Sequence, residues 1–340
     1  MKRYTSLLWA AFVLVLGATL GATLLEGRAD RTGAKPERIV TAYTTMPPEQ
    51  ASLLAAEYEK LAKVRVHFTP MAPGELARRL HDEGGKAEAD LVLADCSVLK
   101  RAAREGAFVP YVSESTDSVS RVLKDEEGAW TGVWYDPIVF CFNRDYLRTL
   151  PRVPESWSEL AAWPGMRLGM TDFFAADAAS NLYFTLLSVY GEQEVLHWLS
   201  QMHPKVVQYV KFLSTPARMA GMGEVDAAVA VQSETLRYLN DGYSLHIVYP
   251  ADGTAYMLTG VGLLRKGRPD AEAFIDWLLS DEAQLVLQRE GVFFVPANTD
   301  TLAYKQLAGK DLVLFGAEPG FTPEQRQALL DRWLKDVRFK

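Results

Sequence analysis

The chain has 340 residues, of which 49 % are hydrophobic and 23 % are charged, a composition typical of a folded globular protein rather than a disordered or repetitive one. This length exceeds the size at which a single hydrophobic core usually stops growing, so we expect two lobes. The formal net charge of −7 argues against nucleic acids and anionic membranes as partners, because both repel an acidic surface.

Residues 1–29 have the pattern of an export signal. Lys2 and Arg3 precede an uncharged run over residues 7–25, and Gly27-Arg28-Ala29 could serve as a cleavage site. The run is close to the ~20 residues that span a bilayer, so an uncleaved anchor is an open alternative. Without this segment the chain has 33 basic and 42 acidic side chains, since the segment holds three basic residues and one acidic residue. We therefore expect a periplasmic or extracytoplasmic protein, with tethering to the membrane by this segment as the alternative.

Strands and helices alternate in the next part of the chain. Residues 38–43 and 64–68 are predicted strands, and residues 89–94 form a nearly all-apolar strand typical of a parallel sheet buried on both faces. Thr44-Thr45 and Asp95 to Ser97 each follow one of these strands. In open α/β sheets ligands bind beyond the carboxyl ends of the strands, so we expect both junctions at one ligand-binding edge.

Two apolar strands bracket the middle of the chain. Residues 137–142 lie within the run WTGVWYDPIVFCFNR, and residues 257–264 read MLTGVGLL. Such a pair indicates a chain that leaves one lobe, builds a second lobe and returns. Beyond it, residues 270–289 predict one long amphipathic helix and residues 322–333 a terminal helix capped by Thr322. The pattern predicts a hinged protein with its ligand in the cleft.

Cys96 and Cys141 are the only cysteines, and each lies in an apolar stretch. An even number permits one disulfide in an oxidising compartment. Two buried free thiols are the commoner outcome for so sparse a pair, and we expect them here, with the disulfide as the alternative.

Several segments, by their order and spacing, resemble the bacterial extracellular solute-binding proteins of ABC importers, in the branch that binds ferric iron, phosphonates, sugar phosphates, thiamine and polyamines. These segments are Tyr43-Thr44-Thr45, Gly74 to Cys96, Trp134 to Asn143, Tyr249 to Thr254 leading into Gly260-Val261, and Ala273 to Gly291.

The resemblance implies an α/β protein with the two-lobe type-II periplasmic-binding fold, which delivers its ligand to a permease. Lobe one would comprise residues 36–138 plus 260–340, and lobe two residues 143–257. The hinge strands would lie near residues 137–143 and 257–264.

Side chains at strand ends, helix starts and hinges are the candidate ligand-binding residues. Hydroxyls and helix N–H groups at Thr44-Thr45 suit an anion, and Ser180-Asn181 and Ser214-Thr215 could clamp it from lobe two, although such residues are usually only caps. Members of the family that this sequence resembles place ligand contacts beside the hinges, which adds Tyr135 and Tyr256 to the candidates. The full set is Thr44, Thr45, Asp95, Tyr135, Ser180, Asn181, Ser214, Thr215, Gln232 and Tyr256.

These residues favour a small oxyanion, above all a phosphorylated or phosphonate compound, held by hinge closure. A polyamine-like or thiamine-like cation is the main alternative, and it would use Asp95 and Asp136 together with the aromatic rings of Trp134 and Tyr135. A membrane-tethered sensory domain that signals to a receptor is an alternative of a different class.

Ferric iron is a weaker alternative. Iron-binding members of the family typically carry two adjacent tyrosines, and this chain has no Tyr-Tyr pair, so Tyr43, Tyr135 and Tyr256 would have to converge. The five histidines show no metal-ligand spacing.

Enzyme motifs are missing from the sequence: it has no G-x-S-x-G, P-loop, complete G-x-G-x-x-G, H-E-x-x-H or C-x-x-C. We therefore expect a binding protein and not an enzyme, with no cofactor and no metal site. The expected partners are a small-molecule ligand and an inner-membrane ABC permease, with no nucleic acid, and we expect a monomer.

Overall fold

The computed structural model describes residues 38–84, 86–309, 312–315 and 320–340. The predicted export signal and anchor, residues 1–29, lies outside this part of the chain. Within the described ranges no helix combines the length and hydrophobicity needed to cross a bilayer.

The described strands form one hydrogen-bonded network in the order β2-β1-β3-β9-β4-β7-β5-β6, with β10 and β8 also paired to β4. The strands are β1 (Ile39–Thr44), β2 (Arg65–Pro70), β3 (Leu91–Asp95), β4 (Thr131–Asn143), β5 (Leu168–Thr171), β6 (Val206–Val210), β7 (Ala227–Val231), β8 (Leu245–Val248), β9 (Tyr256–Leu263) and β10 (Val295–Pro296).

Helices flank this sheet in an α/β arrangement. They are α2 (Pro48–Ala62), α3 (Pro73–Glu83), α4 (Cys96–Arg104), α5 (Glu114–Asp117), α6 (Arg144–Leu147), α7 (Trp157–Ala162), α8 (Asp177–Tyr190), α9 (Glu192–Met202), α10 (Ser214–Gly221), α11 (Gln232–Asn240), α12 (Pro269–Leu278), α13 (Asp281–Arg289), α14 (Leu302–Leu307) and α15 (Pro323–Trp333).

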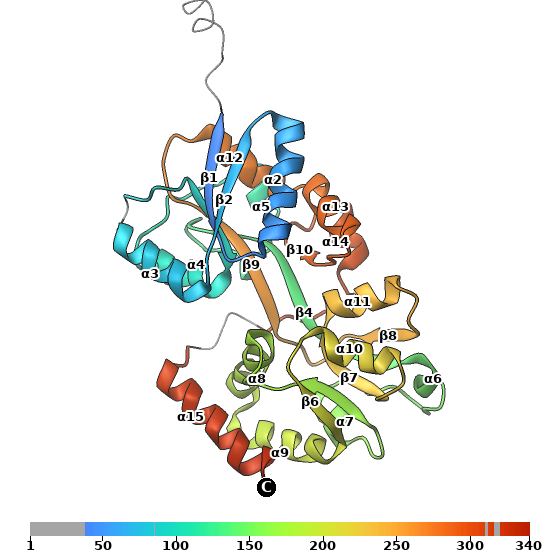
Figure 1. Cartoon of the computed structure of the whole chain (residues 1–340). Helices are drawn as coiled ribbons and strands as arrows, with labels where there is room; N and C mark the ends of the chain where they lie inside the picture. Colours follow the sequence, from blue (N-terminus) through green and yellow to red (C-terminus); the bar gives the residue numbers. More distant parts are fainter. Residues whose placement is uncertain (1–37, 85, 310–311, 316–319) are drawn as a thin grey trace, which may run out of the picture.

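Strand β4 passes from one lobe to the other. Its first half pairs antiparallel with β9, and residues 138–142 pair antiparallel with β7. In Figure 1, β4 and β9 run between an upper group of elements, which contains β1 and α4, and a lower group, which contains α8 and β7. Every residue of β4 is buried, including residues 137–142, for which the sequence predicts a buried strand.

Two glycines allow β4 and β9 to approach closely. Gly132 of β4 pairs with Gly260 of β9. A Cβ atom on Gly132 would lie 2.5 Å from the carbonyl oxygen of Leu123, and one on Gly260 would lie 2.7 Å from that of Thr131. Both distances are too short for any side chain, so these positions require glycine.

Hydrophobic residues gather in separate cores on the two sides of this crossing. One core contains Leu93, Trp134 and Phe274. Another contains Phe140 and Trp157, and a smaller cluster lies beside it. The change from the first core to the second occurs within β4, so one continuous strand belongs to both lobes.

The prediction that residues 260–340 belong to lobe one is wrong for the C-terminal helix. Trp333 of α15 is fully buried in the second core, with its ring centroid 4.8 Å from that of Phe173. The preceding segment crosses to that side, because the backbone N–H of Phe315 donates a hydrogen bond to the carbonyl of Thr254. Apolar periodicity shows that a helix has a buried face, but it does not show which core buries it.

The helix predicted over residues 270–289 is in fact two helices. Helix α12 ends at Leu278, and the hydroxyl of Ser280 then accepts a hydrogen bond from the backbone N–H of Ala283, which caps α13. A serine side chain that bonds to the backbone favours a new helix start over continuation. The capping role predicted for Thr322 is confirmed, since Thr322 and Gln325 form a capping box.

Both cysteines are free, as expected, but the expected burial is found for Cys141 alone. Cys141 is buried in β4, and Cys96 is partly exposed at the start of α4.

Candidate ligand-binding site

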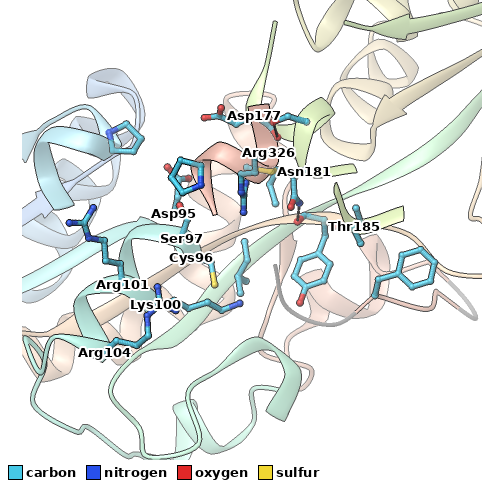
Figure 2. A pocket seen from close by; sticks show the side chains of 18 residues that line it. Asp95, Cys96, Ser97, Lys100, Arg101, Arg104, Asp177, Asn181, Thr185 and Arg326 are labelled. Atoms are coloured by element: carbon cyan, nitrogen blue, oxygen red, sulfur yellow. Dashed lines mark hydrogen bonds between the residues drawn. The ribbon is translucent and has the colours of Figure 1, made fainter. Parts of the chain in front are cut away.

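A cavity of about 480 Å³ lies between elements of the two lobes. Helix α4 forms one wall, α8 and the start of α15 form the facing walls, and β9 lies between them. The buried face of α4 belongs to the first core, whereas α8 and α15 pack in the second. Figure 2 shows the side chains that converge on this cavity, which is the cleft of the molecule.

The basic wall follows from the amphipathic character of α4. Strand β3 ends at Asp95, and α4 then buries Val98 and Leu99 against the first core. The opposite face carries Lys100, Arg101 and Arg104, all of which line the cavity. Figure 2 shows these three side chains together on one side of the site.

Two cations of this wall have no partner among the residues that the structure describes. Arg101 donates a hydrogen bond from Nε to a carboxylate oxygen of Glu105 at 3.2 Å. By contrast, no hydrogen bond or ion pair joins Lys100 or Arg104 to another residue within the described part of the chain. Their charges are thus available for an anionic ligand.

The facing wall offers polar groups on a fixed helix. Ser180, Asn181 and Thr185 of α8 line the cavity. The Asn181 side-chain amide donates a hydrogen bond to the backbone carbonyl of Tyr256 at 3.0 Å, which ties α8 to β9 beside the hinge. The position of this wall is therefore coupled to the strand that connects the lobes.

Among the described residues that line the cavity, basic side chains outnumber acidic ones. Arg326 of α15 joins the three cations of α4, whereas Asp95 and Asp177 are the acidic side chains that line it. This balance makes the site attractive to an anion, although the protein as a whole is acidic.

Four of the predicted site residues line this cavity: Asp95, Ser180, Asn181 and Tyr256. Thr45 does not line the cavity but contacts Asp95, because its hydroxyl accepts a hydrogen bond from the backbone N–H of Asp95 at 3.1 Å. This bond confirms that the two βα junctions meet at one edge of the sheet.

Three other predicted residues are buried and do not line the cavity. The Thr44 hydroxyl donates to the carbonyl of Leu93 at 2.7 Å, and the Gln232 side-chain amide donates to the carbonyl of Leu307 at 2.7 Å. The Tyr135 ring is 3 % exposed and packs edge-on against Tyr256. The Thr44 hydroxyl and the Gln232 amide N–H are thus used in internal hydrogen bonds in this conformation, and a ligand contact through any of the three residues stays a prediction.

Ser214 and Thr215 begin α10, and neither lines the cavity. A hydroxyl cap is the usual role of such residues, but the residue at the cap position is Leu213 and no side chain caps the helix. A role for this pair in binding also stays a prediction.

The sequence prediction missed the basic residues of the site. Lys100, Arg101 and Arg104 had a readable signal, because they share one face of a helix that directly follows a predicted binding junction. Arg326 had none, since only the docking of α15 on the second core brings it to the cleft.

Asp136, one of the residues considered for a cationic ligand, forms hydrogen bonds within the protein. Its carboxylate accepts hydrogen bonds from the backbone N–H of Ser233 at 2.9 Å and from the hydroxyl of Ser233 at 2.6 Å. Burial raises the pKa of this carboxyl from 3.8 to about 7, against the lowering effect of the Ser233 bonds. Asp136 therefore links β4 to α11 and does not line the cavity.

Asp136 should make the stability of the protein depend on pH. Because its pKa is higher in the folded state than its ordinary value of 3.8, its contribution to stability is fully present below about pH 4 and is lost as the pH rises through about 7. The Asp136→Asn variant should therefore show a smaller drop in melting temperature between about pH 5 and about pH 8 than the wild type. Equal drops in the two proteins would show that Asp136 is ionised throughout this range.

The three tyrosines considered for ferric iron do not converge. The Tyr43 hydroxyl donates a hydrogen bond to Glu83 at 2.8 Å, and Tyr43 does not line the cavity. Burial raises the pKa of Tyr256 to about 12 and also raises that of Tyr135, which disfavours the phenolate form that binds iron. Among the residues that the structure describes, no group of three or more His, Cys, Asp or Glu side chains is placed to hold a metal ion.

Comparison with known proteins extends these observations. The profile of a family described as bacterial extracellular solute-binding protein matches residues 39–292. An uncharacterised protein of Haemophilus influenzae is 27 % identical over 291 residues, which cover 81 % of this chain and 84 % of that protein. The Fe(3+)-binding periplasmic protein of Serratia marcescens is 26 % identical over 253 residues, which cover 69 % of this chain and 72 % of that protein.

A solved structure shares the architecture. The periplasmic binding protein AfuA of Actinobacillus pleuropneumoniae, with exogenous fructose-6-phosphate bound, has a TM-score of 0.65 at 21 % sequence identity. The likeness covers 90 % of this chain and all of that chain. It confirms the predicted α/β fold with two lobes. This chain belongs to the bacterial extracellular solute-binding proteins, the family that its sequence resembles.

Proposed function

We propose that this protein is the solute-binding component of an ABC importer and that it captures a small phosphorylated or phosphonate solute in the cleft between α4, α8 and α15. The observation that carries this proposal is the excess of basic side chains in a cavity of about 480 Å³. A volume of this size lies within the range of roughly 300–1,000 Å³ that is usual for small-molecule sites.

The chemistry of the walls suits a phosphate or phosphonate group. Such a group carries about −1.5 to −2 charges near neutral pH when it is a phosphate monoester. Lys100 and Arg104 can form charge-assisted hydrogen bonds with its oxygens, which are stronger than neutral ones. Ser97 and Asn181 add neutral polar groups for the rest of the solute.

The connection between the lobes supports capture by closure. The cavity walls belong to different cores, and β4 and β9 join those cores. A rotation about these strands would bring α4 toward α8 and exclude water from the solute. The closed form would be the state that a permease in the inner membrane recognises, and we place the protein in the periplasm for this reason.

Cationic ligands fit the same cavity less well. A polyamine, thiamine or ferric ion would face Lys100, Arg101 and Arg104 across the site. The relatives allow either class, because the Serratia protein is named for iron and the Actinobacillus protein holds a sugar phosphate. The positive charge of the cavity walls favours the phosphorylated class over the cationic one.

A thermal-shift panel tests this proposal. The purified protein is heated with fructose 6-phosphate, glycerol 3-phosphate or 2-aminoethylphosphonate, and separately with spermidine, thiamine or ferric citrate, with fructose as the uncharged control. A ligand at ~1,000 times its dissociation constant stabilises the folded state by ~4 kcal/mol, which raises the melting temperature by several degrees in a protein of this size. We expect a rise with the phosphorus compounds alone. A rise with the cations alone would refute the proposal.

A further inference from the structure

Helix α15 lies outside the part of the chain that matches the family profile, which ends at residue 292. It is nevertheless fixed on the second core. Trp333 is fully buried, and the hydroxyl of Tyr183 donates a hydrogen bond to the carbonyl of Leu329 at 3.0 Å. Arg332 also forms an ion pair with Glu192 of α9. The helix is thus held by α8 and α9 and moves with the lobe that they build.

The start of α15 reaches the cleft. The capping box of Thr322 and Gln325 sets where the helix begins. Pro323 and Arg326, in its first turns, line the cavity. Figure 2 shows Arg326 in the same view as Asn181 of α8 and the basic wall of α4, so three separate elements present polar side chains to one space.

Packing orients the Arg326 side chain. Its guanidinium carbon lies 4.9 Å from the ring centroid of Phe184, a cation–π contact. Its Nε donates a hydrogen bond to the backbone carbonyl of Phe321 at 3.3 Å. A guanidinium held in this way loses little further freedom when it binds an anion, and its planar fork matches the oxygens of a phosphate group.

We propose that α15 is a ligand-recognition element and that Arg326 is a specificity-determining residue that contacts the anionic group of the solute. The inference rests on the function proposed above. Lys100 and Arg104 belong to the lobe of α4, whereas Arg326 belongs to the lobe of α8. An anion between them is attracted to both lobes at once, so it favours closure, and an uncharged analogue does not.

Isothermal titration calorimetry with fructose 6-phosphate tests this role. The Arg326→Gln variant should bind this probe roughly ten- to hundredfold more weakly than the wild type, the loss expected for one charge-assisted hydrogen bond. The Arg326→Lys variant keeps the charge without the planar fork, so its affinity should lie between the two. The affinity of Arg326→Gln should also fall less steeply with added salt, because fewer charges meet the phosphate.

Arg332→Gln is the matched control. Arg332 lies on the same helix and carries the same charge, but it pairs with Glu192 and does not line the cavity. Its replacement should change the affinity by less than about twofold, since partly exposed ion pairs contribute little. The melting temperature of each ligand-free variant shows that it is folded at the temperature of the titration.

The outcomes separate this inference from the proposed function. Wild-type affinity for fructose 6-phosphate in Arg326→Gln and Arg326→Lys would overturn the role of Arg326 and leave the proposed function standing. Equal weakening in Arg332→Gln would also overturn it, because the effect would then come from the docking of the helix. A wild-type protein that binds none of the phosphorus compounds would overturn both.

Discussion

Joint replacement of Lys100 and Arg104 by alanine should weaken the binding of a phosphate monoester by roughly a hundredfold or more. Both side chains line the cleft, and neither has a hydrogen-bond or ion-pair partner in the described part of the chain. Each is expected to form a charge-assisted hydrogen bond, and two such bonds together contribute about 3 kcal/mol or more to binding. Titration calorimetry of the double variant with fructose 6-phosphate measures the effect.

The matched control removes one lysine and one arginine from the surface outside the cleft. The side chains of Lys60 and Arg148 are 71 % and 75 % exposed and lie outside the cavity. Their joint replacement by alanine changes the net charge equally but should leave the affinity within about twofold of the wild type, because exposed charges far from the site are screened. Equal losses in the two double variants would show that only the overall charge matters, and unchanged affinity in the first would remove α4 from the site.

Replacement of Trp333 by alanine should lower the free energy of unfolding by about 3–5 kcal/mol, the usual cost of deleting a large buried aromatic side chain. Trp333 is fully buried, and its ring packs against Phe173, Phe174 and Tyr209. Within the described ranges its indole N–H has no hydrogen-bond partner, so the expected loss comes from packing. Denaturant unfolding at neutral pH gives the measurement.

Arg332, the residue before Trp333, provides the control for this stability measurement. Arg332→Gln should cost less than about 1 kcal/mol, since this side chain is half-exposed and forms a surface ion pair. A Trp333→Ala variant as stable as the wild type would show that α15 is not docked on the second core. It would also withdraw the physical basis for placing Arg326 in the cleft.

Much of the fold could be predicted because it depends on local patterns. The apolar run of β3 and its polar junction at Asp95 indicate a buried strand followed by a helix, and the junction does meet Thr45. The long apolar run around Pro137 predicts the strand that crosses between the lobes. Such features depend on residue type and period alone.

The remaining features depend on contacts between distant segments. No sequence pattern indicates that the chain crosses back after α14 and buries Trp333 against Phe173. Nor does a pattern show that the hydroxyl of Thr44 donates a hydrogen bond to the carbonyl of Leu93. The same holds for the hydrogen bond from the side-chain amide of Gln232 to the carbonyl of Leu307. Polar residues at strand ends and helix starts are good candidates for ligand contact, but internal hydrogen bonds compete for the same groups.

The most direct test of the account is a crystal structure of the protein grown with the phosphorus compound that gives the largest thermal shift. We expect the phosphorus atom to lie in the cavity between α4, α8 and α15, with its oxygens within hydrogen-bond distance of Lys100 or Arg104 and of Arg326. A phosphorus atom bound instead near Thr44 and Ser214, with no contact to these three cations, would contradict it.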